Sequence, residues 1–266
     1  MDVSASFQFL VDSFHHPWHV IAPDWRGYGL SDWGGGDSYW YPDYFADLDR
    51  LLAHFQSDEP VLLAGHSMGG NVASMYAGIR PKRVLRLVNL EGFGLLDARP
   101  EEAPRRYARW LAEIEKGAGF RDYASFEDLA ARLCANNRRL AHARALFLAR
   151  HWGSVAPHGR VVLRSDPAHK RVNPVLYRLE EAKACWRNVS APVLWVRGED
   201  SHNDSALKLS AEDRDARKAS FRNLVERVIP DSGHMMHHDQ PELLAALIED
   251  FLLSAGEGRS RGQAAE

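Results

Sequence analysis

The stretch Val61-Leu-Leu-Ala-Gly-His-Ser-Met-Gly-Gly70 decides the fold. A short apolar run is followed at once by the pattern G-x-S-x-G, in which Gly65 and Gly69 flank Ser67. Between a strand and a helix, this pattern places the serine on a tight turn, with glycine where backbone segments come close. The helix that follows points its first N–H groups at the reacting centre, so the Met68 amide is an expected oxyanion donor. The stretch therefore predicts a nucleophilic serine.

A serine hydroxyl needs a base, and the candidate is His234, which lies between the last predicted strand and the last predicted helix. Two further histidines, His237 and His238, raise the alternative of a metal site. A catalytic zinc needs additional ligands, and no second His, Cys or Asp cluster in the sequence has suitable spacing. We therefore expect neither a metal nor a cofactor. The two later histidines are expected at the surface or around the site.

The third member of such a site is a carboxylate that orients the imidazole. Asp200 is the first choice, because it follows the penultimate predicted strand. Glu91, at the end of the strand after the serine's helix, is the alternative acid. Asp204 is a third possibility.

Short apolar runs bounded by Pro, Gly or Asp predict buried strands of a mostly parallel sheet. They cover residues 19–22, 61–64, 84–90, 193–196 and 225–229. Helical patterns lie between them at 44–55, 71–79 and 241–253, the last with Asp239 as its expected N-cap. This alternation predicts an α/β fold, with an open sheet covered by helices on both faces.

Residues 98–187 break the alternation and are mainly helical, so we expect them to form a cap over the sheet edge that carries the serine. The expected helices are 101–116, 126–136 with Ser125 as N-cap, 140–151 and 174–186, with a short extended run at 161–163. Trp110, Phe147 and Trp152 are candidate pocket walls. The predicted core is then discontinuous, 1–97 and 188–253, and the Gly- and Ser-rich residues 254–266 are an expected disordered tail.

The net charge of −3 conceals a basic segment, because residues 98–187 carry 18 Lys or Arg against 10 Asp or Glu. No nucleic-acid-binding motif accompanies it, so we expect no nucleic-acid partner. A solvated helical surface is the plain interpretation, and a preference for an anionic substrate is the alternative. Two cysteines, Cys134 and Cys185, exclude a disulfide framework. The sequence lacks a signal-peptide pattern and an apolar run of about 18 residues, so we expect a cytoplasmic protein without membrane contact.

With these residues placed, the chain resembles the α/β-hydrolase superfamily, in its cap-bearing serine hydrolase branch, over residues 8–253. The resemblance includes residues 19–32, where Asp24, Arg26 and Gly27 are expected to be structural. The order Ser67, Asp200, His234 matches that of nucleophile, acid and base. The resemblance implies an esterase-like enzyme that cleaves an ester or related acyl bond of a small-molecule substrate through an acyl-enzyme.

The chain departs from the family pattern at two places. Many relatives carry the acid three residues after the strand-end glycine; that position here is Ser201, which keeps Glu91 open. Relatives also begin with strands and a His-Gly turn that supplies a second oxyanion donor. Their lack here implies an N-terminally truncated sequence, and a non-catalytic remnant is then one alternative. A carbon–carbon bond hydrolase or an acyltransferase is another; substrate and oligomeric state are not indicated.

Overall fold

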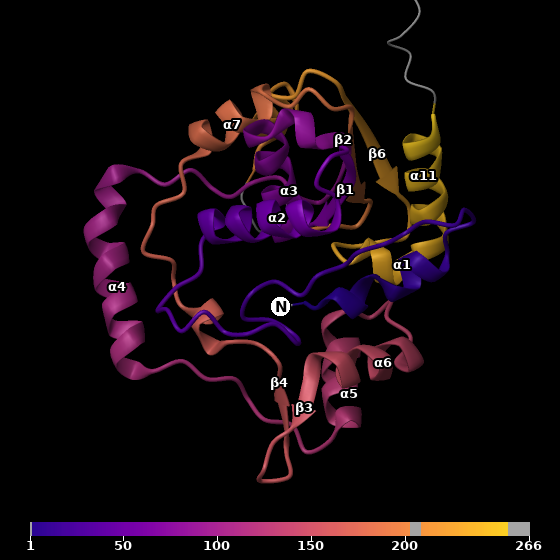
Figure 1. The fold of residues 1–266 in the computed structure, drawn as a ribbon. Helices are drawn as coiled ribbons and strands as arrows, with labels where there is room; N and C mark the ends of the chain where they lie inside the picture. The colour runs from indigo at the N-terminus through magenta and orange to yellow at the C-terminus, as the bar shows by residue number, and fades with distance from the viewer. Residues whose placement is uncertain (1, 203–208, 255–266) are drawn as a thin grey trace, which may run out of the picture.

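A four-stranded parallel sheet lies at the centre of the computed structural model, which describes residues 2–202 and 209–254. Its strands run in the order β1 (Val61–His66), β2 (Val84–Leu90), β5 (Val193–Gly198) and β6 (Leu224–Ile229). Each strand pairs in parallel with its neighbour, so helical crossovers must connect them (Figure 1). The carboxyl ends of all four strands consequently meet at one edge of the sheet.

Four of the five predicted strands are confirmed, and the run at residues 19–22 is not a strand. Val20 and Ile21 are 41% and 43% exposed. A strand exists only where a neighbour accepts and donates its backbone hydrogen bonds. Within the described residues, β1 pairs with β2 alone, and no ladder reaches residues 19–22. The apolar composition of residues 19–22 therefore predicted a strand that the segment does not form.

Helices cover both faces of the sheet, as the alternation predicted. One face packs under α2 (Tyr41–Phe55), α3 (Met68–Ile79) and α7 (Leu179–Arg187), around Leu87 and Trp195. The other face packs under α11 (Pro241–Leu253), α10 (Met236–Asp239) and α1 (Gln8–Asp12), around Val88, Leu194 and Val196. Successive strand residues point to opposite faces, and this divides the core in two.

Asp239 was expected to be the N-cap of α11, but it is not. The N-cap of that helix is Gln240, whose side chain makes no capping bond. Asp239 instead accepts hydrogen bonds from the Gly233 backbone N–H at 2.9 Å and from Asn137 Nδ2 at 2.7 Å. This carboxylate therefore holds the loop before α10 rather than the helix after it.

Residues 98–187 hold the helices α4 (Ala103–Lys116), α5 (Phe126–Asn136) and α6 (His142–Trp152), as well as a hairpin of β3 (Gly153–Val155) and β4 (Val161–Leu163). The helix expected at 174–186 is α7, which packs on the sheet through Ala182 and Trp186 and not in a separate cap. Ser125 caps α5 as predicted, since its hydroxyl accepts from the Asp128 N–H at 3.1 Å. Helices α5 and α6 pack on each other and on β4. Helix α4 lies apart from the sheet (Figure 1), and none of its residues is buried.

Five short elements complete the described chain. The 3-10 turns are η1 (Ser4–Phe7), η2 (Pro81–Arg83), η3 (Pro100–Glu102) and η4 (Pro167–Lys170), and α9 (Ala211–Lys218) precedes β6. None of the described helices has the length and apolar character needed to cross a membrane.

An aromatic stack joins the 98–187 segment to the rest of the molecule. The His169 ring lies between the rings of Tyr28 and Tyr39, with both centroid distances 3.9 Å. Gly27, with φ of 78°, adjoins this stack, and a Cβ there would meet His169 Nε2 at 2.5 Å. Because a side chain at position 27 would displace this ring, Gly27 is structural, as predicted. Partial burial lowers the pKa of His169 to about 4, so the ring is neutral near pH 7.

Asp24 and Arg26 also serve structural roles. The Asp24 carboxylate accepts from the Ser4 and Leu30 N–H groups at 2.6 and 2.8 Å, and so joins the first turn to the segment after residue 22. The Arg26 guanidinium contacts Asp47 of α2 through two hydrogen bonds of 2.6 Å. Such a bidentate pair fixes the angle between the segment and the helix.

Candidate active site

Ser67 lies at the turn between β1 and α3 with φ of 53° and ψ of −116°. A non-glycine residue rarely adopts a positive φ, and such strain is typical of functional positions. A Cβ on Gly65 would lie 2.3 Å from the Gly69 carbonyl oxygen, so position 65 requires glycine. Around Gly69 the nearest atom to such a Cβ is Trp25 Nε1, at 3.9 Å. Only the first glycine of the pattern is therefore sterically obligatory.

Met68 is the first residue of α3. Its N–H is one of the four at the start of a helix that have no acceptor within the helix, and these carry the positive end of the helix dipole. The amide therefore has the position and the free hydrogen that an oxyanion donor needs.

Glu91 and His234 are brought together by the ends of two different elements. Glu91 directly follows β2, and His234 lies in the loop between β6 and α10. The Oε2 atom of Glu91 is 3.0 Å from Nδ1 of His234. The carboxylate side chain is fully buried, whereas the imidazole is 37% exposed. This geometry suits a carboxylate that orients a histidine whose other nitrogen faces a reactant.

The Glu91 carboxylate is held by two further donors. The Gly198 N–H at the end of β5 donates to Oε1 at 2.9 Å, and the Ser201 hydroxyl donates to Oε2 at 2.6 Å. Glu91 itself has φ of 58°, so the acid, like Ser67, is held in a strained backbone conformation. These hydrogen bonds fix the orientation of the buried carboxylate toward His234.

Asp200, the first choice for the acid, lies elsewhere. Its carboxylate forms an ion pair with Arg139 at 2.5 Å, and both side chains are more than 40% exposed. The following residue, Ser201, is the one that turns inward to the Glu91 carboxylate. Asp204, the third candidate, lies outside the described residues. Of the described candidates, the structure therefore places Glu91, and not Asp200, against His234.

The proton positions follow from this arrangement. A carboxylate can only accept, so His234 donates Nδ1–H to Glu91 and leaves the lone pair of Nε2 available as a base. The hydrogen bonds of the described residues do not include one between the Ser67 hydroxyl and His234. In unliganded hydrolytic sites this contact is often long and tightens when substrate binds.

His66, the residue before Ser67, was not singled out from the sequence. Its Nε2–H donates to the His234 backbone carbonyl at 2.7 Å. Burial, followed by the neighbouring His237 and His234 rings, lowers the pKa of His66 well below 6.5, so the ring is neutral. The x of G-x-S-x-G gives no signal of this role, because the bond depends on a loop 168 residues away.

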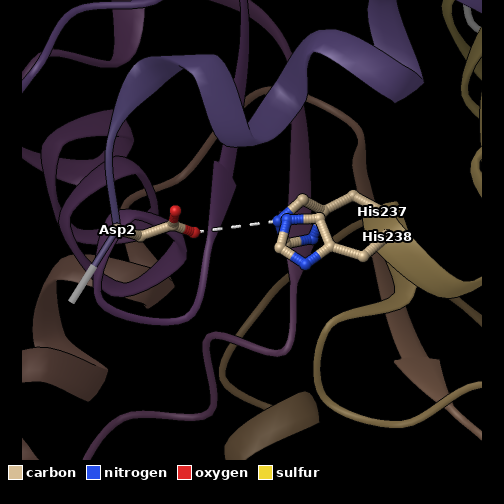
Figure 2. A group of neighbouring side chains, drawn as sticks. All are labelled: Asp2, His237 and His238. Atoms are coloured by element: carbon tan, nitrogen blue, oxygen red, sulfur yellow. Dashed lines mark ion pairs between the residues drawn. The ribbon is translucent and has the colours of Figure 1, made fainter. Parts of the chain in front are cut away.

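His237 and His238 were expected at the surface or around the site, and the structure excludes the surface for both, while the His237 ring lies beside that of His66 with centroids 4.5 Å apart. They are 0% and 3% exposed, and burial lowers the pKa of each to about 3. Figure 2 shows their rings beside the carboxylate of Asp2, with His237 Nε2 3.8 Å from Asp2 Oδ2. The Ser6 hydroxyl lies 3.1 Å from His237 Nε2 and 2.5 Å from His238 Nε2. These rings therefore belong to the packing against the first turn of the chain.

The larger described pocket, of about 470 Å³, does not reach the serine. It is lined by α2, α4 and residues 174–178, including Trp40, Tyr107 and Tyr177. None of the three expected pocket walls lines it: Phe147 and Trp152 pack with α5 and α6, and Trp110 lies on α4. A pocket between residues 98–187 and Ser67 was expected, but Ser67 lines neither this pocket nor the one lined by Phe9, His15 and Arg144.

Comparison with known proteins decides the family. The family model for the alpha/beta hydrolase fold matches residues 2–241. The chain is an α/β-hydrolase-fold protein. This α/β hydrolase is 26% identical over 266 residues to a serine hydrolase-like protein of Danio rerio, covering 94% of the chain and 78% of the relative. It is also 26% identical to 2-(acetamidomethylene)succinate hydrolase of Mesorhizobium japonicum, covering 94% and 84%.

Solved structures support the same fold for this α/β hydrolase. A thioesterase domain from the curacin biosynthetic pathway superposes with a TM-score of 0.78 at 22% identity, over 93% of this chain and 86% of the domain. At that identity the likeness establishes the fold only. The hydrolase-named relatives support a hydrolase in general terms.

Proposed function

We propose that this α/β hydrolase is a serine hydrolase that cleaves an ester or related acyl bond with a triad of Ser67, His234 and Glu91. The observation that carries the proposal is the 3.0 Å contact between His234 Nδ1 and the buried Glu91 carboxylate, close to a serine with a strained positive φ. Glu91 replaces Asp200 as the proposed acid because the Asp200 carboxylate forms an ion pair with Arg139.

In the proposed mechanism, the Ser67 oxygen attacks the acyl carbon while Nε2 of His234 accepts the hydroxyl proton. The resulting imidazolium is stabilised by Glu91 and passes that proton to the leaving group, which departs as an alcohol, thiol or amine. Water then attacks the acyl-enzyme and loses a proton to Nε2, which returns it to the Ser67 oxygen as the acid product leaves. The Met68 N–H is the proposed donor to the negative oxygen formed in both steps.

A small acyl compound with a negative charge is the proposed substrate class. The 98–187 segment supplies an excess of Arg and Lys. The Mesorhizobium relative is named for a succinate derivative, and the curacin relative is named a thioesterase. Oxoester, thioester and amide carbonyls all present the acyl carbon that the triad attacks. The cytoplasm is the proposed location.

The proposal is tested by labelling with a fluorophosphonate probe and by hydrolysis of p-nitrophenyl esters and thioesters. The wild type is expected to be labelled once and Ser67→Ala not at all. Turnover should fall by about 10⁴-fold or more in that variant, because triad members act as a unit. Ser57→Ala, at an exposed serine, is the matched control. Labelling of Ser67→Ala at the wild-type level would refute the assignment.

A further inference from the structure

Three metal-ligating side chains gather beside the proposed triad without belonging to it. Asp2, His237 and His238 each offer one ligand atom, and these atoms all lie within 4.8 Å of one another. Figure 2 shows the two rings facing the carboxylate, which comes from the first turn of the chain. Both imidazoles are buried, whereas the Asp2 side chain is 30% exposed. Solvent can therefore reach the group from the Asp2 side, while the two imidazoles form its buried side.

The protons of this group do not satisfy it fully. The single Ser6 hydroxyl proton can be donated to only one of the two Nε2 atoms within its reach, so the other ring must donate to the Ser6 oxygen. Nδ1 of His237 is buried without a hydrogen-bond partner among the described residues. A buried polar network that is partly satisfied is costly. Two neutral imidazoles and a carboxylate are therefore held together without enough protons and acceptors to pair every nitrogen.

We propose that Asp2, His237 and His238 form a binding site for a divalent cation of the zinc type. Two imidazole nitrogens and one carboxylate oxygen are a ligand set that zinc accepts, with water as a fourth ligand. Calcium and magnesium prefer oxygen ligands throughout, so the nitrogen donors select against them. The inference is independent of the hydrolytic activity proposed above.

The geometry requires a small adjustment. Tetrahedral zinc with bonds of about 2.1 Å sets its ligand atoms about 3.4 Å apart. The 3.8 Å between Asp2 Oδ2 and His237 Nε2 is already close to that spacing. The Ser6 hydroxyl lies between the rings, so binding requires the Ser6 side chain to turn to another staggered rotamer. Loss of its two hydrogen bonds is then replaced by two zinc–nitrogen bonds.

The proposed site would join two distant parts of the chain. Asp2 precedes η1, and His237 lies three residues after His234 in the same loop and helix. A bound cation would fasten the first turn to the segment that carries the proposed base. Since the cation binds only the folded arrangement, it should raise the thermal unfolding temperature of the protein.

The experiment titrates zinc into the metal-free protein against a chromophoric chelator, with thermal unfolding as a second readout. The wild type is expected to bind one tightly held zinc and to unfold at a higher temperature with it. Asp2→Asn and His238→Gln should each weaken that binding by about tenfold or more, which corresponds to about 1.4 kcal/mol. His158→Gln is the matched control, because it removes an exposed histidine whose Nε2 lies 2.9 Å from Asp122.

Two outcomes would overturn the site. Unchanged zinc affinity in Asp2→Asn, together with its loss in His234→Ala, would place the ion at the triad instead. Equal losses in His158→Gln and His238→Gln would show unspecific binding to surface histidines. Circular dichroism of each metal-free variant checks folding, and Asp2→Asn keeps the test decisive if His238→Gln does not fold, because Asp2 is partly exposed.

Discussion

The hydroxyl of Ser201 donates a 2.6 Å hydrogen bond to Oε2 of Glu91, the oxygen that also contacts His234. Ser201 occupies the position at which many relatives in the resemblance carry the acid. Glu91 reaches His234 from the end of the neighbouring strand β2. The carboxylate and its hydroxyl donor therefore come from the ends of two different strands, β2 and β5.

The first prediction compares the two candidate acids, each replaced by its amide. Glu91→Gln should reduce kcat by about 10³–10⁴-fold, because an amide cannot stabilise the imidazolium or fix the tautomer. Asp200→Asn should change kcat less than threefold, since it removes an exposed ion pair of small worth. Steady-state hydrolysis of a p-nitrophenyl ester measures both. If Asp200→Asn lowered kcat more than Glu91→Gln did, Asp200 would be the acid instead.

Moving the acid gives the second prediction. Glu91→Ala combined with Ser201→Asp should regain at least about tenfold in kcat over Glu91→Ala alone, a gain of about 1.4 kcal/mol in transition-state stabilisation. The reason is that Ser201 Oγ already lies beside the oxygen that His234 contacts. Ser201→Asn in the same background is the control, because it has the shape without the charge. Recovery with Asn would show a packing effect instead.

The two glycines of the motif should respond differently to alanine. Gly65→Ala places a Cβ 2.3 Å from the Gly69 carbonyl and should destabilise the protein by about 1–3 kcal/mol or prevent folding. Gly69→Ala meets nothing closer than 3.9 Å and gains helix propensity in α3, so its stability should equal or exceed that of the wild type. Urea unfolding midpoints measure the difference. Equal midpoints would contradict the close approach at Gly65.

The partly buried ring of His169 predicts a dependence of stability on pH. Its folded pKa of about 4 lies below the unfolded value of about 6.5, so the unfolded chain binds more protons between these limits. Stability from this ring is complete above pH 6.5 and falls with pH by at most about 1.4 kcal/mol per unit down to pH 4. His169→Phe keeps the stacking with Tyr28 and Tyr39 and should make the acid slope shallower.

The control for that slope is His19→Phe, at an exposed position. Urea midpoints measured from pH 4 to pH 7 give the comparison. A slope in His169→Phe equal to the wild-type slope would mean that other groups, such as the buried His237 and His238, dominate acid unfolding.

Most of the core elements could be predicted because their signals are local. The limits of β2 and the span of α11 follow from an apolar run and from a proline followed by helical periodicity. The segment at residues 19–22 has the same kind of run but no neighbour to pair with among the described strands. Pairing is a property of the sheet, so no local pattern could reveal its absence.

The candidate site was predictable to a lesser degree. Ser67 and His234 come from motifs whose geometry is set within a few residues. The choice between Asp200 and Glu91 depends on which of two adjacent residues turns inward after β5, and Ser201 does. The burial of His237 depends on the first turn of the chain, and the Phe7 ring stacks on it with centroids 4.9 Å apart. That contact joins positions with no detectable relation in the sequence.

The bond from His66 to the His234 carbonyl has a consequence for how the molecule opens. The residue next to the nucleophile holds the backbone of the base, so the loop of His234 can open only after this hydrogen bond breaks. Opening of the loop then costs at least the net free energy of one hydrogen bond, about 0.5–1.5 kcal/mol. In hydrogen–deuterium exchange, the amides around residue 234 should therefore exchange more slowly than those of the exposed helix α4.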